Sequence, residues 1–197
     1  MCGLLGAVST GGKFLASDDI KILIEIGKKA QRRGVDASGL VLMEADHNLQ
    51  IVKANHGFGK MIRSSQGRSL LQQARMNSSY SLFGHSRLET HGYSGSSSNN
   101  QPVIIGDWVV VHNGVITNAP SLRSEVKVDD LKIESDTVAI ALLLEEWDKN
   151  GREEDIDQVF ERLQGEYSVV AASTSGEIIC RTNVGNLYSA KSDSGTI

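Results

Sequence analysis

The chain alternates short apolar runs with longer stretches in which apolar residues recur every three or four positions. Short apolar runs bounded by Gly, Ser, Asn or Asp are typical of buried strands, and the longer period is typical of helices with one buried face. The first pattern predicts strands at residues 2–8, 40–43, 49–53, 79–87, 103–105, 108–111, 165–172 and 176–182, and more weakly at 187–190. The second pattern predicts helices at 17–33, 121–126, 135–150 and 155–163, with one or two short helices within 57–78.

Polar residues and glycines between these segments predict where the elements begin, end and turn. Ser17 and Ser135 stand where a side chain caps a helix, and Gly151 stands where a helix stops. Gly106-Asp107 separates two strands of a predicted hairpin. Asn113-Gly114 favours positive φ, so we expect the chain to turn there and to present backbone N–H groups.

The stretch at residues 93–101 is rich in Ser, Gly and Asn and offers almost no apolar side chain to bury. It is too short to link two domains, and a length of 197 residues suits one domain with a large core. We therefore expect a single domain in which this stretch is a flexible loop that acts as a lid over a site of neighbouring polar residues.

Composition and charge narrow the classes of function. Hydrophobic residues make up 40% of the chain and charged residues 22%, and the net charge is −4. This charge gives no electrostatic reason to expect nucleic acid or an anionic membrane as a partner. The N-terminus lacks the basic and apolar regions of a signal peptide, and no stretch reaches the ~18 apolar residues of a membrane span. These features predict a cytoplasmic protein.

The chain holds two cysteines, Cys2 and Cys180, and five scattered histidines. A reducing cytoplasm argues against a disulfide between the cysteines. Cys180 lies in a strand-like run, which predicts a place in the core. The Cys and His residues lack the close spacing of a zinc site, so neither a metal nor a cofactor is predicted.

Cys2 follows the initiator methionine directly and has small residues around it. Removal of Met1 would leave a cysteine whose α-amine, with a reference pKa of roughly 7.7–8.0, can take the thiol proton at neutral pH. Nucleophile and base would then come from one residue. On these two residues alone, a small buried cysteine that opens the first strand is the commoner explanation.

Six short segments stand in this order along the chain: MCGLLG at residues 1–6, RGVDASG at 33–39, GHSRLETHG at 84–92, NQP at 100–102, VHNGVITN at 111–118 and SDT at 135–137. Together they resemble the class II glutamine amidotransferase domain, which is the glutaminase part of asparagine synthetases, glucosamine-6-phosphate synthases and glutamine phosphoribosylpyrophosphate amidotransferases. The resemblance implies an N-terminal nucleophile hydrolase fold of the α+β class, a four-layer αββα sandwich. The helices at 17–33 and 135–150 would cover one face.

The resemblance also implies a reaction, the hydrolysis of the side-chain amide of glutamine to glutamate and ammonia through a thioester. Cys2 would be the nucleophile and its α-amine the base. The side-chain amide of Asn113 and the backbone N–H of Gly114 would stabilise the oxyanion of the tetrahedral intermediate.

Five further residues match positions in this family, four around the substrate and one that supports the site. Arg87 would bind the α-carboxylate of glutamine through its planar guanidinium. Asp136 would bind the α-ammonium, although it could instead assist Ser135 at a helix N-terminus. Thr90 and His91 would flank the same pocket. Arg33 would lie near Cys2 and help to orient the site, or would be a solvated charge at a helix end.

The identity of the ammonia acceptor stays open. Arg87-Leu88 matches asparagine synthetases, since glucosamine-phosphate synthases typically carry Trp at the position of Leu88, whereas Thr90-His91-Gly92 resembles the latter enzymes. We expect residues 1–197 to be one glutaminase domain, the N-terminal part of a longer protein, which serves an ammonia-accepting synthase domain or subunit.

Two other functions are considered. An N-terminal nucleophile amidase for another amide would have no use for both Arg87 and Asp136, which bind the two charges of an amino acid. An inactive interaction domain would be expected to lack Cys2 or Asn113, and the chain has both.

Overall fold

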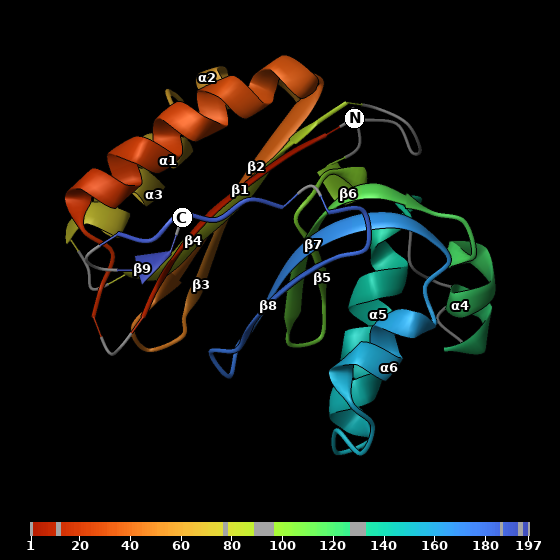
Figure 1. Ribbon diagram of the computed structural model, residues 1–197. Coiled ribbons are helices and arrows are strands. Elements are labelled where there is room, and N and C mark those ends of the chain that lie inside the picture. The colour runs from red at the N-terminus through yellow and green to blue at the C-terminus, as the bar shows by residue number, and fades with distance from the viewer. Residues whose placement is uncertain are drawn as a thin grey trace.

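Two antiparallel β-sheets lie face to face in the computed structural model, and helices cover the outer side of each sheet (Figure 1). The structure describes residues 2–10, 13–76, 79–88, 97–126, 133–185, 187–192 and 195–196. The strands of the first sheet are β1 (Gly3–Ser9), β2 (Ala37–Glu44), β3 (Leu49–Ala54), β4 (Ser79–Arg87) and β9 (Gly195–Thr196), in the order β3-β2-β4-β1-β9. The strands of the second sheet are β5 (Val103–Ile105), β6 (Trp108–Ile116), β7 (Gly165–Ser173) and β8 (Ile178–Thr182), in the order β5-β6-β7-β8.

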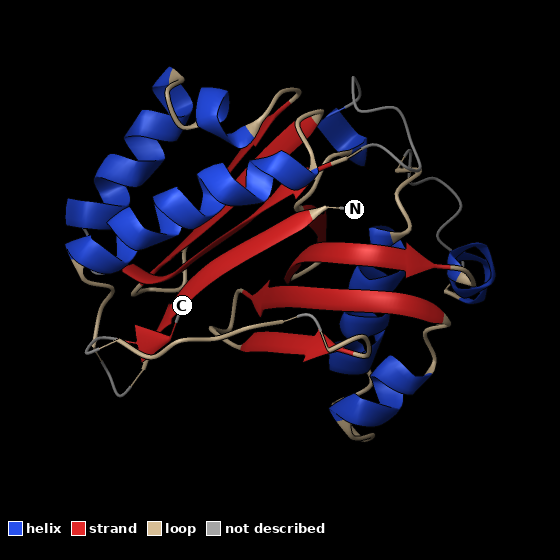
Figure 2. Ribbon diagram, turned by 45° about the horizontal axis from the view of Figure 1, so that its top comes forward, coloured by secondary structure: helices blue, strands red, loops and turns tan. Residues whose placement is uncertain are grey.

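Helices form the two outer layers (Figure 2). The five-stranded sheet is covered by α1 (Ser17–Ala30), its 3-10 continuation η1 (Gln31–Arg33), α2 (Phe58–Met61) and α3 (Ser65–Met76). The four-stranded sheet is covered by α4 (Ala119–Glu125), α5 (Thr137–Lys149) and α6 (Ile156–Glu161), and a 3-10 helix, η2 (Ser97–Asn99), precedes β5. This order of layers confirms the predicted αββα sandwich. Among the described helices, none is both long and apolar enough to cross a membrane.

The strands alternate between an inner face, toward the other sheet, and an outer face, toward the helices. In β2, Val41 and Met43 lie between the sheets, whereas Leu40 and Leu42 pack against the helices. Because both faces are buried, such strands read as continuous apolar runs, which is the pattern seen in the sequence. The apolar inner layer consists of Val41, Met43, Phe83, Val109, Val111, Val170 and Ala172, with partly buried neighbours.

This inner layer becomes polar at one end. In β4, every second residue faces the other sheet, so the inner face continues from Phe83 to His85 and Arg87. In β2, Gly39 and Ala37 lie directly opposite His85 and Arg87. These small residues leave room between the sheets for two large polar side chains.

The predicted arrangement of the two long helices is wrong. We expected the helices at 17–33 and 135–150 to cover one face, but α1 packs on β1 and α5 packs on β6, on opposite outer sides of the molecule. The spacing of apolar residues identifies a buried stripe on each helix, but it does not say which sheet the stripe contacts.

The predicted helix caps are also wrong, whereas the predicted helix stop is confirmed. Ser17 is the first residue of α1 and therefore not its cap, which is Ala16. The carboxylate of Asp19 accepts the backbone N–H of Ala16 (3.0 Å). Ser135 donates its hydroxyl to Thr137 Oγ1 (3.1 Å) and does not cap α5. Gly151, with a φ of 71°, follows the end of α5.

Three predictions about the strands are wrong. The chain does not turn at Asn113-Gly114, because β6 continues through both residues to Ile116, paired with β7; the turn lies at Gly106-Asp107, where it was also expected. Residues 187–190 form no strand. Cys180 is exposed rather than in the core, because β8 is an edge strand and its side chains have fewer neighbours.

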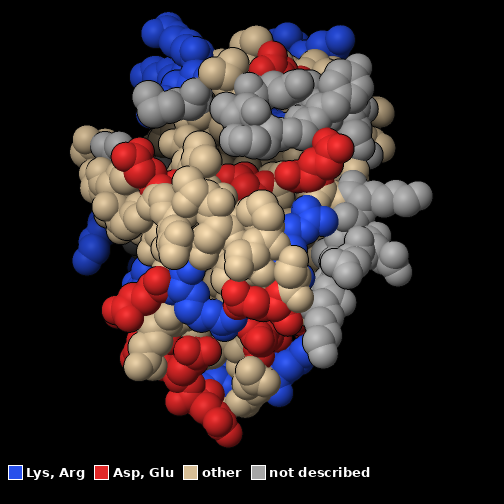
Figure 3. Space-filling model, turned by 90° about the vertical axis from the view of Figure 1, so that its right-hand side faces the viewer, with Lys and Arg blue, Asp and Glu red and all other residues tan. Residues whose placement is uncertain are grey.

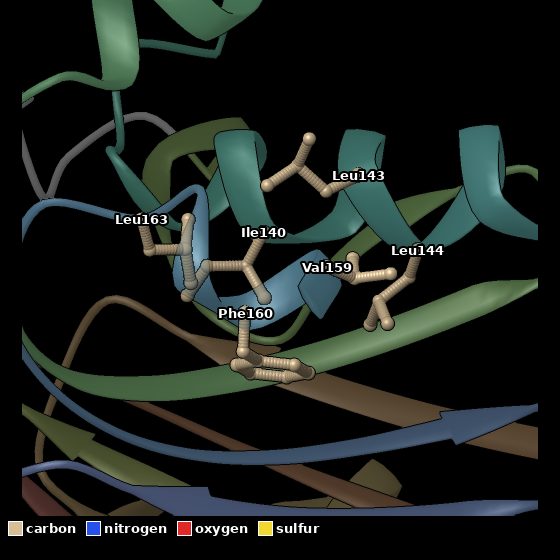
Figure 4. Close-up of a pocket in the computed structure, with 6 residues that line it drawn as sticks. All are labelled: Ile140, Leu143, Leu144, Val159, Phe160 and Leu163. Carbon is tan, nitrogen blue, oxygen red and sulfur yellow. The ribbon is translucent and has the colours of Figure 1, made fainter. Parts of the chain in front are cut away.

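A small pocket lined by α5, α6 and the residues just after α6 belongs to the core (Figure 4). All side chains that line it are apolar, so it offers no group that could orient a polar ligand. The lining residues are Ile140, Leu143, Leu144, Val159, Phe160 and Leu163. The pocket is a small gap in the packing of the helical layer and not a candidate site.

The outside of this half of the molecule carries charges of both signs side by side (Figure 3). Arg162 links the helices there by ion pairs with Glu146 (2.8 Å) and Glu125 (3.5 Å). Pairs that are partly open to solvent, such as these, contribute only about 0–1 kcal/mol each, so the core and not the surface holds this layer in place.

The close approach of β2 to the segment before β5 gives a testable prediction. A Cβ atom at Gly39 would overlap the backbone oxygen of Gln101, whereas one at Gly6 would lie 3.3 Å from Phe83 Cβ. We expect Gly39→Ala to lower the free energy of unfolding by about 1–3 kcal/mol, and the matched Gly6→Ala variant to change it by less than about 1 kcal/mol. Urea denaturation of both variants measures this difference, and equal stabilities would contradict it.

Candidate active site

The site lies where the N-terminal end of β1 meets the middle of β6, at the polar end of the inner layer (Figure 1). Cys2 immediately precedes β1, and its backbone nitrogen donates a hydrogen bond to Oδ1 of Asn113 on β6 (3.1 Å). This bond joins the two sheets. Because Oδ1 of Asn113 faces Cys2, the amide nitrogen at the other end of this side chain is directed elsewhere, and no described residue accepts a hydrogen bond from it.

Gly114 follows Asn113 in β6 and can only be glycine in this geometry. Its φ is 146°, a region that L side chains rarely adopt, and a Cβ atom would overlap the backbone oxygen of Glu166 on β7. The positive φ expected for Asn113-Gly114 is therefore present at Gly114, although it occurs within a paired strand and not in a turn.

Arg87 ends β4, and only 4% of it is exposed. Its position follows from strand pairing, because Gly3 pairs with Ser86 and thereby brings Cys2 next to Arg87 in the sheet. Nη1 of Arg87 donates to Oδ1 of Asn100 (2.6 Å). A buried guanidinium thus stands beside the thiol.

Asp136 immediately precedes α5, and its side chain makes no hydrogen bond with the start of that helix. Instead, Oδ2 accepts the backbone N–H of Ile116 (2.8 Å), and Oδ1 lies 4.0 Å from Nδ1 of His112. The alternative role of assisting Ser135 at the helix terminus is therefore not what this carboxylate does. With 18% of its side chain exposed, Asp136 is still accessible.

The surroundings of the Cys2 thiol set its acidity. Burial raises the pKa of the thiol, the positive charge of Arg87 lowers it, and the negative charge of Asp136 raises it. Both charged side chains therefore lie within electrostatic range of the sulfur. Since the net effect is a raised pKa, the thiol is protonated at neutral pH and needs a local base to become a nucleophile.

Comparison with known proteins identifies the family. A family model described as a glutamine amidotransferase domain matches residues 85–196, which include Arg87, Asn113, Gly114 and Asp136. The chain belongs to this family. Glutamine–fructose-6-phosphate aminotransferases are among its relatives: the protein from Francisella tularensis is 33% identical over 88% of this chain, and that from Buchnera aphidicola is 29% identical over 100% of it. The chain spans only 27% and 30% of these two proteins.

Solved structures confirm the fold of this glutamine amidotransferase domain. Glutamine phosphoribosylpyrophosphate amidotransferase from B. subtilis, complexed with ADP and GMP, superposes with a TM-score of 0.72 at 19% identity, covering 99% of this chain and 41% of that one. A structure described as the allosteric regulatory enzyme of purine biosynthesis gives 0.71 at 20% identity, covering 95% and 38%. The fold is the one that the resemblance implied.

Three residues predicted for the site of the amidotransferase domain are not placed beside Cys2. Thr90 and His91 lie outside the described residues, as do residues 93–96 of the predicted lid. Arg33 is exposed on η1, which lies near β1 and β4, so its role in orienting the site stays a prediction.

The sequence did not reveal the buried polar residues that surround the predicted ones. Asn99, Asn100 and Gln101 were expected to belong to a loose loop but are buried and hydrogen-bonded, so for these residues the prediction of a flexible lid is wrong. His85 and His112 are buried as well. Buried amides before a proline leave no periodic pattern in the sequence. The signal that could have pointed to Asn100 and Gln101 was the NQP segment at residues 100–102, which resembles the family.

His85 makes the stability of the domain depend on pH. Burial lowers its pKa to about 3, and the nearby His112 and Arg87 contribute to the shift. The unfolded chain binds a proton near pH 6.5 and the folded chain does not, so this contribution to stability is complete above that pH and is lost as the pH falls toward 3.

We expect His85→Gln to flatten the dependence of unfolding free energy on pH between 6.5 and 4 by up to about 1.4 kcal/mol per pH unit. Part of the slope should remain, because burial also lowers the pKa of His112. Urea denaturation at pH 7.5 gives the baseline for each protein. Parallel pH profiles of the variant and the parent protein would contradict this assignment.

Proposed function

We propose that this chain is a glutaminase that hydrolyses the side-chain amide of glutamine and supplies ammonia to a synthase domain or subunit. The observation that carries the proposal is the hydrogen bond from the Cys2 nitrogen to Asn113 Oδ1, because it brings the proposed nucleophile, base and oxyanion donor to one point. The family match and the fold support the same reaction.

In the proposed mechanism Met1 is first removed, and the Cys2 nitrogen, an amide in the 197-residue chain, becomes the free α-amine. The amine takes the thiol proton, and Sγ attacks the carboxamide carbon of glutamine. The side-chain amide of Asn113 and the backbone N–H of Gly114 stabilise the oxyanion, and each such donor typically contributes ~10²–10³ in rate. The ammonium then protonates the leaving nitrogen, ammonia departs, and a thioester remains.

Hydrolysis of this thioester completes the cycle. The α-amine removes a proton from water, the resulting hydroxide attacks the thioester carbon, and the same oxyanion donors act a second time. The C–S bond breaks, glutamate leaves and the thiol regains its proton. The raised pKa of the Cys2 thiol fits this cycle, because it keeps the proton on sulfur until the amine takes it.

Recognition of glutamine rests on two opposite charges. We assign the α-carboxylate to the guanidinium of Arg87 and the α-ammonium to Asp136, whose carboxylate is held by β6 and not by its own helix. Thr90 and His91 are proposed to flank the same pocket. This pair of charges favours an amino-acid amide over the other amides that a related amidase would take.

The relatives differ in the second substrate that their names give. The curated relatives are named for fructose 6-phosphate, and the solved structure from B. subtilis is named for phosphoribosylpyrophosphate. The names of both kinds of protein begin with glutamine, so glutamine hydrolysis is the part of the reaction that we propose for this chain.

The nucleophile can be tested directly. We expect the intact mass of the purified protein to show loss of one methionine residue, and Cys2→Ala to abolish glutamate release, because no thioester can form. A variant in which an extra residue keeps the Cys2 nitrogen as an amide should be inactive too. Glutaminase activity of Cys2→Ala would remove Cys2 from the mechanism, and activity of the extended variant would remove the α-amine as its base.

Arg87→Lys tests recognition of the carboxylate. Lysine keeps the positive charge but loses the planar fork, and at a position that is 4% exposed we expect the KM for glutamine to rise about 100-fold, a loss of ~3 kcal/mol. The matched control is Arg152→Lys, which changes an arginine just beyond the C-terminal end of α5 that pairs with Asp148 and Glu177. An unchanged KM in the Arg87 variant would remove Arg87 from the pocket.

A further inference from the structure

Three consecutive polar side chains before β5 are almost completely buried. Asn99, Asn100 and Gln101 are 3%, 1% and 6% exposed, and each one is hydrogen-bonded to a different part of the candidate site. Buried amides are costly unless their donors and acceptors are paired, so these contacts define the position of the segment. We call residues 99–101 the amide strap.

Asn99 holds the segment that leads into α5. Its Nδ2 donates to Oε2 of Glu134 (2.9 Å), and its Oδ1 accepts the backbone N–H of the same residue (2.8 Å). Glu134 lies two residues before Asp136, which we propose binds the substrate ammonium. The two reciprocal bonds therefore fix the approach to Asp136.

Asn100 holds the guanidinium of Arg87 in place. Its Oδ1 accepts from Nη1 of Arg87 (2.6 Å), and its Nδ2 donates to Oδ1 of Asn55, just beyond the end of β3 (2.7 Å). The second bond fixes the orientation of the Asn100 amide, since exchanging its oxygen and nitrogen would break both hydrogen bonds. The guanidinium is thus braced from the edge strand of the five-stranded sheet.

Gln101 holds the strand that carries the oxyanion donors. Its Nε2 donates to the backbone oxygen of His112 (2.9 Å) and to Oγ1 of Thr137 (3.0 Å), and its Oε1 accepts the backbone N–H of His112. His112 immediately precedes Asn113, and Thr137 immediately follows Asp136. One side chain therefore connects β6 to the start of α5.

We propose that the amide strap positions the two charges that bind glutamine, and that Asn100 does so without adding a negative charge beside Arg87. This inference rests on the proposed function. An aspartate at position 100 could also accept the Arg87 hydrogen bond, but its carboxylate would compete with the substrate carboxylate for the guanidinium. A neutral amide orients the guanidinium and leaves its charge to attract the substrate.

The test is the near-isosteric variant Asn100→Asp, assayed for glutamate release over a range of glutamine concentrations. Because a permanent carboxylate would stand next to Arg87, we expect the KM for glutamine to rise roughly 10- to 100-fold, while kcat changes by less than about threefold. The fold should persist, since the new carboxylate is paired with Arg87. A thermal melt of the same sample checks this.

The matched control is Asn183→Asp. Asn183 also makes two hydrogen bonds through its amide, accepting from the backbone N–H of Tyr167 and donating to the oxygen of Gly165 (both 2.8 Å), but it lies on the other side of β7 from β6. We expect this variant to lose thermal stability and to keep the KM and kcat of the parent protein. The contrast separates a role in the site from a role in folding.

Asn55→Ala provides a second, uncharged variant, which removes the support behind Asn100. We expect a smaller increase in KM, about threefold to tenfold, at unchanged kcat. Turnover of glutamine by the parent protein tests the proposed function on its own. Given that turnover, a parental KM in Asn100→Asp, or a fall in kcat without a rise in KM, would overturn the role of the strap.

Discussion

The inner face of the sandwich must serve two purposes that conflict. Along most of its length it is a dry apolar layer that holds the two sheets together, and at one end the same faces of the same strands carry His85, Arg87 and Asn113. A charge in that position is tolerated only if it is paired and hydrogen-bonded. Small residues opposite, such as Gly39 and Ala37, and amides from the segment before β5 meet this requirement.

This constraint explains why the candidate site lies at the end of the sheets and not in a surface loop. Cys2 reaches Asn113 only because β1 lies in one sheet, β6 lies in the other, and the apolar layer sets the spacing between them. The site depends on the whole sandwich for its geometry. Burial also affects the proposed nucleophile, since a thiol with a raised pKa stays protonated, and therefore unreactive, until a base is presented to it.

Local patterns in the sequence predicted the individual strands and helices, whereas the order of the layers and the residues around Cys2 were implied by the resemblance to a family. Period-two and period-3.6 patterns predict strands and helices, and short segments with a resemblance to a family indicate the proposed nucleophile and its partners. The turn at Asn113-Gly114 was wrong because nine ladder pairs with β7 outweigh the local preference of an Asn-Gly pair. Gly114 keeps the backbone angle that the pair favours but uses it within the strand.

The amide strap could not be predicted for a different reason. Buried amides at 99–101 have the same composition as a solvated loop, and what distinguishes them is the set of partners, which lie up to 45 positions away in the chain. No window of local sequence contains those partners. The interpretation of 93–101 as a lid failed at its C-terminal end for this reason. Asn100 and Gln101 nevertheless belong to one of the segments that resemble the family.

The two proposed charges for glutamine stand on different halves of the molecule. Arg87 belongs to the five-stranded sheet, and Asp136 leads into the helix that covers the four-stranded sheet. A bound amino acid would therefore act as a cross-link between the halves, with its binding free energy added to the cohesion of the sandwich through mass action. Substrate occupancy and resistance to unfolding are then two measures of one equilibrium, so that the concentration of free glutamine sets how firmly the halves are held together.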